Sequence, residues 1–257
     1  MEIPRSHPRY HSLVEREKII DGYKKGIVAL QGLLAHGRGE AFDYLIGEKT
    51  QVFAEVAIEA AAALLLISKK PVVSVNGNTA ALVPEHLVAL SKELGAPLEV
   101  NLFYRTRERE VAIYNWLRKH GATMILGVYD ERVELAGLES KRRIVSKKGI
   151  YVADTVFVPL EDGDRTEALR RAGKNVITVD LNPLSRTART ANITIVDNIT
   201  RALPLLVSKV SRLRSLDSIT LRKIIENYDN EKVLGMALEF ISKRLEHLAS
   251  KGVTITF

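Results

Sequence analysis

The segment ITVDLNPLSRTARTANITIVDNITRALP, residues 177–204, contains two short runs of β-branched residues, and an Asp and an Asn follow each run closely. The second run leads directly into a helical pattern. Four side chains suited to phosphate oxygens lie in the connection between the runs: Arg186, Thr187, Arg189 and Thr190. A turn requires none of these side chains, so their presence where a strand gives way to a loop favours a binding function.

Outward from this segment, short apolar runs alternate with helical patterns, which predicts βαβ units and a parallel sheet. Several runs are apolar on both faces, as expected when helices cover both sides of a sheet. The predicted strands are residues 71–75, 98–103, 123–128, 154–160, 175–180 and 193–197. The predicted helices among them are residues 80–94, 108–120, 165–172 and 199–213.

Both flanks of this alternating region have helical patterns. Residues 12–23 and 50–68 are predicted helices, and the second is apolar almost all round, which indicates burial. Near the C-terminus an apolar seam repeats at helical spacing, at Leu234, Leu238, Ile241, Leu245 and Leu248. We therefore predict one α/β domain over residues 1–257, consisting of a helical part (1–70), a sheet core (71–215) and C-terminal helices (216–257).

Composition narrows the class of protein. The net charge of +7 and a pI near 9.5 suit an acidic partner, which a nucleic acid, a membrane surface or a phosphorylated small molecule would each provide. The chain has no cysteine, which excludes disulfides and a thiol nucleophile. The longest apolar run, residues 60–67, is far shorter than the roughly 20 residues that span a bilayer, so we expect a soluble cytoplasmic protein. Few glutamines and many Lys, Arg and Glu are typical of thermophile proteins.

Polar residues gather where the predicted strands end, which is where parallel α/β sheets bind ligands. These segments are VNGN (75–78), FYRTRER (103–109), PLEDGDR (159–165), DLNPLSRTAR (180–189) and DN (197–198). Several of their residues have a structural alternative. Asn198 suits a helix N-cap, which is worth about 1 kcal/mol, and Asp180 and Asn182 suit a turn. The acids of PLEDGDR suit either magnesium or a turn with a helix cap, so a metal contact by Asp162 or Asp164 stays open.

The segment GLLAHGRG, residues 32–39, nearly matches a phosphate-binding P-loop. Arg38 takes the place of the lysine and Gly39 that of the magnesium-binding Ser or Thr, so a Walker-type site is disfavoured. A helix end at Gly37 or Gly39 is the structural alternative. No GxGxxG follows the first predicted strand, and the histidines form no metal or triad pattern.

Several segments together resemble the archaeal phosphopantothenate synthetase family, also called 4-phosphopantoate–β-alanine ligase. They are HPRYHSLVERE, HGRGEAFDYLIGE, VNGNTAALVPE, LESKRRIVSKKGIYVADTVFVPLEDGDRTEAL and VDLNPLSRTARTANITIVDNITRA. The resemblance implies a Rossmann-like parallel sheet flanked by helices, and a homodimer. It also implies an enzyme that makes 4'-phosphopantothenate for coenzyme A from 4-phosphopantoate, β-alanine and ATP, releasing AMP and pyrophosphate, with Mg²⁺ as the expected metal.

The resemblance also implies an ATP site, formed by Arg16, Arg38, Asp180, Leu181, Asn182, Arg186, Thr187, Asn198 and Ile199. We expect Arg38 and Arg186 to act in catalysis, because cations offset the charge that develops on phosphates. For phosphopantoate, chemistry favours the residues that follow the first two strands: Asn76, Asn78, Arg105 and Arg107. Two alternatives remain: a nucleotide-dependent small-molecule kinase, and a nucleic-acid-binding protein, which scattered charges and an aromatic content of 6% disfavour.

Overall fold

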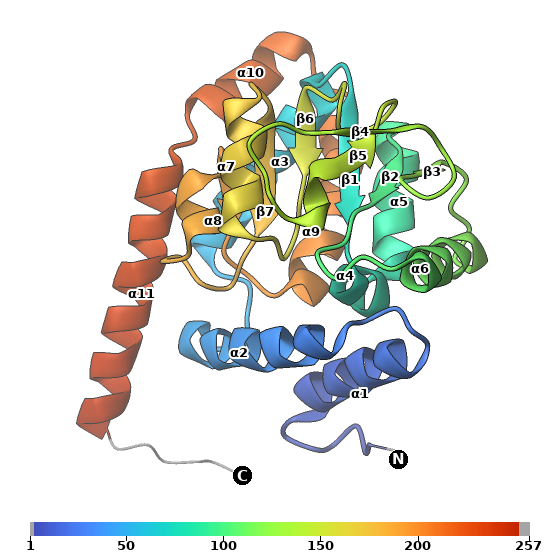
Figure 1. Ribbon diagram of the computed structural model, residues 1–257. Helices are drawn as coiled ribbons and strands as arrows, with labels where there is room; N and C mark the ends of the chain where they lie inside the picture. The colour runs from blue at the N-terminus through green and yellow to red at the C-terminus, as the bar shows by residue number, and fades with distance from the viewer. Residues whose placement is uncertain (1–2, 252–257) are drawn as a thin grey trace.

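Six parallel strands form the central sheet of the computed structural model, which describes residues 3–251 (Figure 1). They are β1 (Pro71–Val75), β2 (Leu98–Val100), β3 (Ile125–Leu126), β6 (Thr155–Phe157), β7 (Asn175–Val179) and β8 (Ile193–Ile195). Their order is β3-β2-β1-β6-β7-β8, so the direction in which the sheet grows reverses between β1 and β6. This is the doubly wound order of a Rossmann-like fold, and it confirms the predicted fold class.

Alternate residues of the strands enter two separate hydrophobic clusters, one on each face of the sheet. Val72, Val156 and Val176 belong to the smaller cluster. Their sequence neighbours Val73, Phe157 and Ile177 belong to the larger one. Because successive side chains of a strand point to opposite faces, burial on both faces requires the continuous apolar runs from which the strands were predicted.

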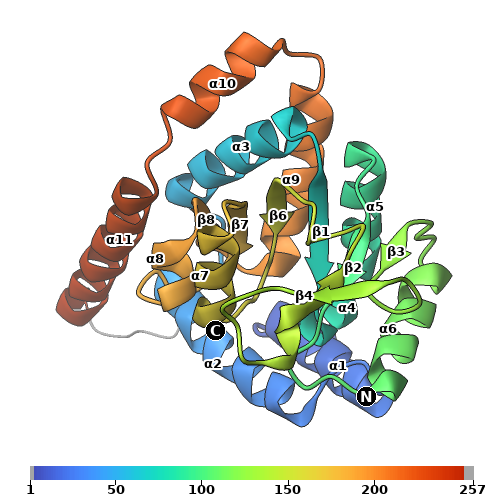
Figure 2. The same ribbon diagram turned by 45° about the horizontal axis from the view of Figure 1, so that its top comes forward.

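Helices α3 (Val52–Ile67), α5 (Pro84–Leu94) and α9 (Ile199–Leu213) cover the face with the larger cluster (Figure 2). The opposite face carries α7 (Gly163–Arg171), α8 (Arg186–Thr190) and the hairpin of β4 (Arg132–Glu134) and β5 (Ile144–Ser146), with the 3-10 turn Lys141–Arg143 between its strands. Helix α6 (Arg107–Lys119) packs beside β2 and α5. No helix within residues 3–251 combines the length and apolar character needed to cross a membrane.

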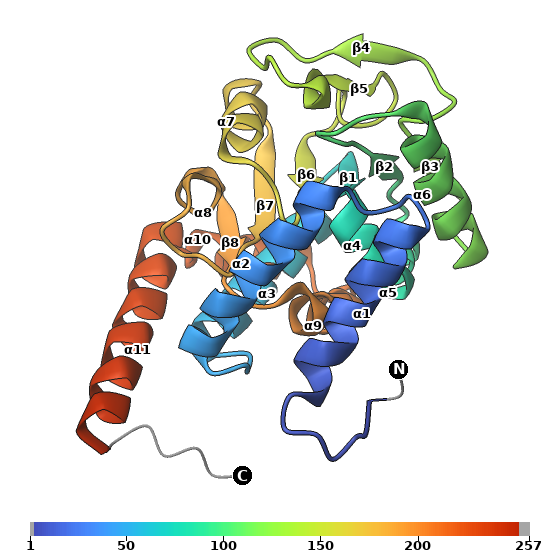
Figure 3. The same ribbon diagram turned by 60° about the horizontal axis from the view of Figure 1, so that its bottom comes forward.

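Two helices lie across the carboxyl ends of the strands, and we call them the roof: α1 (Tyr10–Lys24) and α2 (Leu30–Ile46) (Figure 3). The near P-loop motif lies inside α2, which continues to a left-handed cap at Gly47. The alternative of a helix end at Gly37 or Gly39 is therefore wrong. The predicted helix 80–94 is two helices, α4 (Gly77–Leu82) and α5, because Pro84 starts a new helix after Val83 has left helical geometry.

The chain ends in α10 (Ser218–Glu226) and α11 (Asn230–Lys251). The predicted apolar seam is only partly buried along α11. Leu234 is buried and Ile241 packs against the larger cluster, whereas Leu238 and Leu245 are 37% and 46% exposed. The seam thus alternates between core and surface positions on α11, which runs along the side of the molecule (Figure 1).

Polar side chains hold the β4–β5 hairpin, which the sequence did not predict, on the sheet. Glu99 of β2 is fully buried and accepts hydrogen bonds from the backbone N–H groups of Ser146 (2.9 Å) and Ile150 (2.6 Å). Asn101 donates to the carbonyl oxygens of Arg142 (3.2 Å) and Ile144 (3.0 Å). A Cβ at Gly149 would lie 2.0 Å from Glu99 Oε2, so the close approach requires glycine there.

We predict that Glu99 makes folding stability fall with rising pH. Burial raises the pKa of Glu99 to about 7, from an ordinary value of 4.5. Between these two values the folded chain keeps a proton that the unfolded chain has lost. The contribution of Glu99 to stability is thus fully present below about pH 4.5 and lost by about pH 7. The free energy of unfolding falls by about 3 kcal/mol over this range. Urea denaturation at pH 5 and pH 8 measures the effect. Between these two pH values the free energy of unfolding should fall less in Glu99→Gln than in the wild-type protein. Equal losses in both proteins would contradict the prediction.

Candidate functional site

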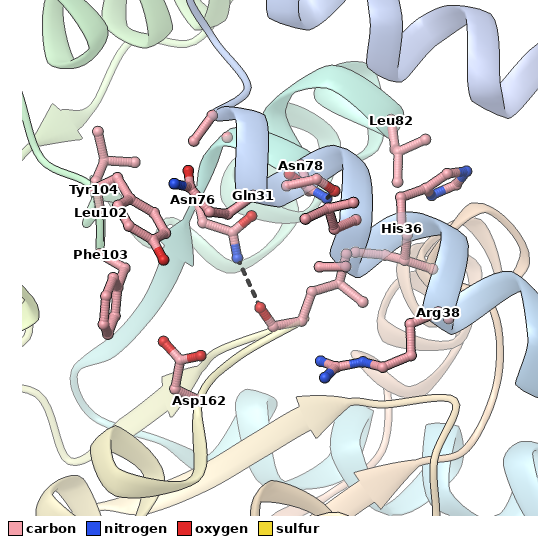
Figure 4. Close-up of a pocket in the computed structure, with 18 of the residues that line it drawn as sticks. Gln31, His36, Arg38, Asn76, Asn78, Leu82, Leu102, Phe103, Tyr104 and Asp162 are labelled. Carbon is pink, nitrogen blue, oxygen red and sulfur yellow. Dashed lines mark hydrogen bonds between the residues drawn. The ribbon is translucent and has the colours of Figure 1, made fainter.

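A cleft of about 550 Å³ lies between the roof and the carboxyl ends of the strands, at the point where the strand order reverses (Figure 4). This is where doubly wound sheets bind their ligands. Helix α2 contributes Gln31, Leu34, Ala35, His36 and Arg38, among others; the strand ends contribute Asn76, Asn78, Leu102, Phe103, Tyr104, Leu160, Asp162, Leu181, Asn198 and Ile199. The sequence prediction that strand-end residues gather around one site is met by this arrangement.

The side chain of Asn76 joins the two strands that flank the reversal. Its Nδ2 donates to the carbonyl oxygens of Pro159 and Leu160, both at 3.1 Å, and its Oδ1 caps α4 by accepting from Thr79 N (Figure 4). Leu160 has φ 55°, the left-handed region that costs a non-glycine residue about 1–2 kcal/mol. Such backbone strain clusters at functional sites, where surrounding contacts maintain it.

The first glycine of the near P-loop, Gly32, allows α2 to approach α4 closely. A Cβ at Gly32 would lie 2.3 Å from Asn78 Oδ1, and Asn78 Nδ2 donates to the Gly32 carbonyl at 2.9 Å. Gly77 is equally restricted, since a Cβ there would lie 2.4 Å from the Ile27 carbonyl oxygen. The motif therefore packs α2 against α4 and forms no phosphate-binding loop.

Arg38 and His36 extend from α2 at one end of the cleft (Figure 4). Arg38 is exposed, and no carboxylate of the described chain forms an ion pair with it. Its charge acts on the half-buried Asp180, where it opposes the rise in carboxyl pKa that burial causes. Burial lowers the pKa of His36, which favours a neutral imidazole.

Asn198, Ile199 and Leu181 line the same end of the cleft. Asn198 caps α9, because its Oδ1 accepts from Thr200 N at 3.1 Å, as the structural alternative predicted. Its Nδ2 also donates to Glu15 Oε2 (3.0 Å) and Asp43 Oδ2 (2.9 Å), both on the roof. One side chain thus starts α9, borders the cleft and attaches the roof.

Other residues expected at the ATP site lie behind the cleft wall. Arg16 binds Glu40, a cleft residue, through two hydrogen bonds of 2.9 Å. Asp180 accepts from the Ser185 hydroxyl and from Asn182 N (2.9 Å), which matches the predicted turn. Asn182 in turn accepts from Leu184 N at 2.9 Å.

The Arg186–Thr190 cluster forms helix α8, where a loop was expected. Arg186 is exposed and donates to Glu167 Oε1 of α7 through Nη2 at 2.8 Å. The hydroxyl of Thr187 donates to the Glu161 carbonyl at 2.9 Å. Arg186 therefore joins α8 to α7, and Thr187 joins α8 to the segment before α7; neither residue lines the cleft.

The four residues expected to bind phosphopantoate are divided between two places. Asn76 and Asn78 line the cleft. Arg105 is buried, with its Nη2 donating to the Ile144 carbonyl at 2.9 Å and its Nη1 3.3 Å from Glu110 Oε1. Arg107 donates to the Val128 carbonyl and lies over the Tyr129 ring. Both arginines thus bind groups outside the lining of the cleft.

The sequence prediction missed Phe103, Tyr104, Arg109 and Arg142, which line the cleft. A signal existed for the first three, since they belong to the strand-end segment FYRTRER. Arg142 lies between two short strands that carry no recognisable pattern, so nothing in the sequence placed it near a strand end.

Acidic residues are dispersed around the site. Within residues 3–251 no group of three or more His, Asp or Glu is arranged to hold a metal ion. Of the two acids whose role stayed open, Asp162 lines the cleft and Asp164 does not. Burial raises the pKa of Asp162, and its Oδ2 lies 3.0 Å from Arg142 Nε.

The fold and the cleft define a Rossmann-like α/β protein whose ligand site lies at the topological switch point and is bordered by arginines, amides and aromatic rings. The chain belongs to the phosphopantothenate/pantothenate synthetase family, whose model matches residues 53–244, and the predicted family is thereby confirmed.

Curated relatives extend the similarity to nearly the whole chain. A 4-phosphopantoate–β-alanine ligase of Thermococcus kodakarensis is 55% identical over 254 residues, which cover 98% of this chain and 97% of that protein. The protein of the same name from Methanosarcina mazei is 50% identical, over 97% of this chain and 98% of its own length. That of Methanospirillum hungatei is 46% identical, over 95% and 98%.

Proposed function

We propose that this chain joins 4-phosphopantoate and β-alanine to form 4'-phosphopantothenate, a step of coenzyme A synthesis. The observation that carries the proposal is the identity of 46–55% with ligases of that name over nearly the full length of both chains. The cleft supports the proposal, because two ends of different chemistry belong to one ligand space. One end, with Arg38 and the start of α9, suits a nucleotide, and the other end carries aromatic and arginine side chains.

The proposed nucleotide is ATP, bound at the Arg38 end of the cleft. The first turn of α9 presents its N-terminus there, and the helix dipole favours an anion at that position. Leu181, Asn198 and Ile199 border the space. Arg16 acts through Glu40, and Asp180 and Asn182 shape the turn after β7. Arg186 and Thr187 join the site from α8, for which Arg186 must exchange Glu167 for phosphate oxygens.

The reaction proceeds through an acyl adenylate. The carboxylate of phosphopantoate attacks the α-phosphorus of ATP and pyrophosphate leaves; the amine of β-alanine then attacks the acyl carbon and AMP leaves. The chain supplies orientation and positive charge and needs no protein nucleophile. Orientation of bound reactants contributes up to about 7–11 kcal/mol to such steps, and arginines offset the charge that develops on the phosphates. The roof shields the reactive adenylate from water.

We propose that Mg²⁺ binds together with the substrate phosphates. Such ions are bound through one or two carboxylates together with phosphate oxygens. Asp162 is the carboxylate suited to this role, because it lines the cleft; its Oδ2 lies 3.0 Å from Arg142 Nε, and the ion would replace that pairing. When bound, the ion would offset the negative charge of the substrates.

We predict AMP and pyrophosphate as products, because the adenylate route cleaves ATP between its α- and β-phosphates. The competing kinase reaction would give ADP. ATP and phosphopantoate should also exchange labelled pyrophosphate into ATP before β-alanine is added, since the amine takes no part in that half-reaction. Formation of ADP without exchange would reject both the mechanism and the ligase assignment.

Removal of Arg38 or Arg186 should lower the activity at least tenfold. Each charge-assisted hydrogen bond to a phosphate contributes about 1.5–3 kcal/mol, and about 1.4 kcal/mol corresponds to a factor of ten. Steady-state rates and ATP affinity of Arg38→Ala and Arg186→Ala measure the effect. Arg170→Ala is the matched control, because Arg170 is exposed on α7 and absent from the cleft. Wild-type activity and ATP affinity in both variants would exclude them from the nucleotide site.

A homodimer forms part of the proposal, and the exposed apolar residues of α11 support it. Met236, Leu238 and Leu245 are each more than a third exposed on a helix that runs along the side of the molecule (Figure 1). Light scattering at micromolar concentration should report twice the mass of the chain, 28.6 kDa. A monomer under these conditions would contradict the prediction.

A further inference from the structure

One end of the cleft, which we call the arginine end, contains two guanidinium groups that the nucleotide proposal does not use. Phe103, Tyr104 and Asp162 lie there, opposite Arg38 (Figure 4). Arg109, which contacts Tyr104, and Arg142, which contacts Asp162, complete this end. Arg109 projects from α6 and donates to two backbone carbonyl oxygens, those of Tyr104 and Ile27 (2.9 Å to Ile27). No carboxylate within residues 3–251 pairs with Arg109, and its Nε is buried without a hydrogen-bond partner.

The side chain of Arg142 is more than nine-tenths buried and is fixed in place. Its Nη1 donates to Glu161 Oε2 at 2.8 Å, and its Nε lies 3.0 Å from Asp162 without forming a hydrogen bond. Glu161 is shared with Arg165, which is fully buried and donates to the Ser74 hydroxyl at 3.2 Å. Arg142 is thus a rigid cation that lines the cleft and is paired with Glu161 and Asp162.

Positive charge exceeds negative charge at this end. Three guanidiniums, of Arg109, Arg142 and Arg165, face two carboxylates, of Glu161 and Asp162. Burial, followed by repulsion from Arg142, lowers the pKa of Arg109. A partly buried cation without a counter-charge is unfavourable, so an anion bound between Arg109 and Arg142 would be strongly favoured.

The wall behind the arginine end adds to the positive field. Arg105, Arg107 and Arg132 surround the single carboxylate of Glu110, which is buried on α6 one residue after Arg109. A concave surface backed by charge of one sign concentrates the field and draws in ions of opposite sign. Arg105 and Arg107 thus contribute to binding through their charge without lining the cleft.

We propose that Arg109 and Arg142 bind the phosphate of the acid substrate, phosphopantoate, at the arginine end. The assignment rests on the proposed ligase function. Leu102, Phe103 and Leu160 supply an apolar surface beside the two cations, which suits the two methyl groups that phosphopantoate carries next to its phosphate-bearing carbon. β-Alanine has neither methyl groups nor a phosphate. The carboxylate of the acid substrate then points toward Arg38 and the nucleotide.

The test compares 4-phosphopantoate with pantoate, which lacks only the phosphate. Arg109→Ala and Arg142→Ala should lower kcat/KM for phosphopantoate roughly 10- to 100-fold, the range expected for loss of charge-assisted hydrogen bonds. Their kcat/KM for pantoate should change little, so the preference for the phosphorylated acid is eroded. If pantoate is turned over too slowly, its inhibition constant against phosphopantoate gives the same comparison.

Two arginines provide matched controls. Arg118 lies on the same helix as Arg109 and likewise donates to a backbone carbonyl, that of Ala122 at 3.0 Å, but outside the cleft. Arg143 adjoins Arg142 and pairs with Glu134 away from the cleft. Arg118→Ala and Arg143→Ala should keep the wild-type preference. If either alanine variant of the arginine end fails to fold, Arg109→Gln and Arg142→Gln retain an amide donor without the charge and carry the test.

The outcomes separate this inference from the proposed function. The first outcome is that the wild-type protein forms AMP and pyrophosphate from phosphopantoate, but the folded variants keep their full preference for phosphopantoate over pantoate. This outcome would overturn only the assignment of the arginine end. A wild-type protein that does not ligate phosphopantoate would overturn both assignments. Loss of preference in the two variants, with unchanged ATP affinity, supports the assignment.

Discussion

The cleft depends on the hydrogen bonds that the Asn76 amide makes across the reversal of the sheet. In a doubly wound sheet the connections after β1 and β6 diverge to opposite faces, which opens a gap between the two strand ends. Asn76 fixes the width of this gap by donating to the carbonyls of Pro159 and Leu160, while its oxygen starts α4. The amide uses donor and acceptor simultaneously, so neither Asp nor Leu would reproduce both contacts.

A second constraint is electrostatic, because single carboxylates serve several arginines throughout the molecule. Glu40 binds Arg9 and Arg16, Glu161 binds Arg142 and Arg165, and Glu167 approaches Arg171 and Arg186. Each cluster is fixed in geometry yet retains net positive charge. Part of the positive charge is therefore held in buried groups, such as Arg142 and Arg165 around Glu161, whereas Arg171 and Arg186 remain on the surface.

The sequence predicted the sheet because its strands are buried on both faces and are rich in Val and Ile, a pattern that is independent of distant contacts. The β4–β5 hairpin could not be predicted in this way. Its strands have three residues each, and the contacts that hold it come from Glu99 and Asn101, more than 40 residues away. Likewise, the expectation that ligand-binding residues follow the strands identified the segment containing Arg105, Arg107 and Arg109. Which of these arginines faces the cleft depends on the direction in which α6 leaves β2.

The roof is attached chiefly by polar contacts, in contrast to the apolar packing of the sheet. Helix α1 buries Ser12, Ile19 and Gly22, and α2 buries only Asp43 and Ile46. Arg201 of α9 bridges Asp43 and the fully buried Asp197, and Asn198 donates to Asp43 as well. These contacts lie at the first turn of α9, which also borders the cleft. Because a polar attachment of this kind contributes less local stability than a buried apolar face, the position of the roof relies on this turn together with the packing of α1 and α2 against α4. Asn198 consequently borders the cleft and also attaches the helices that cover it.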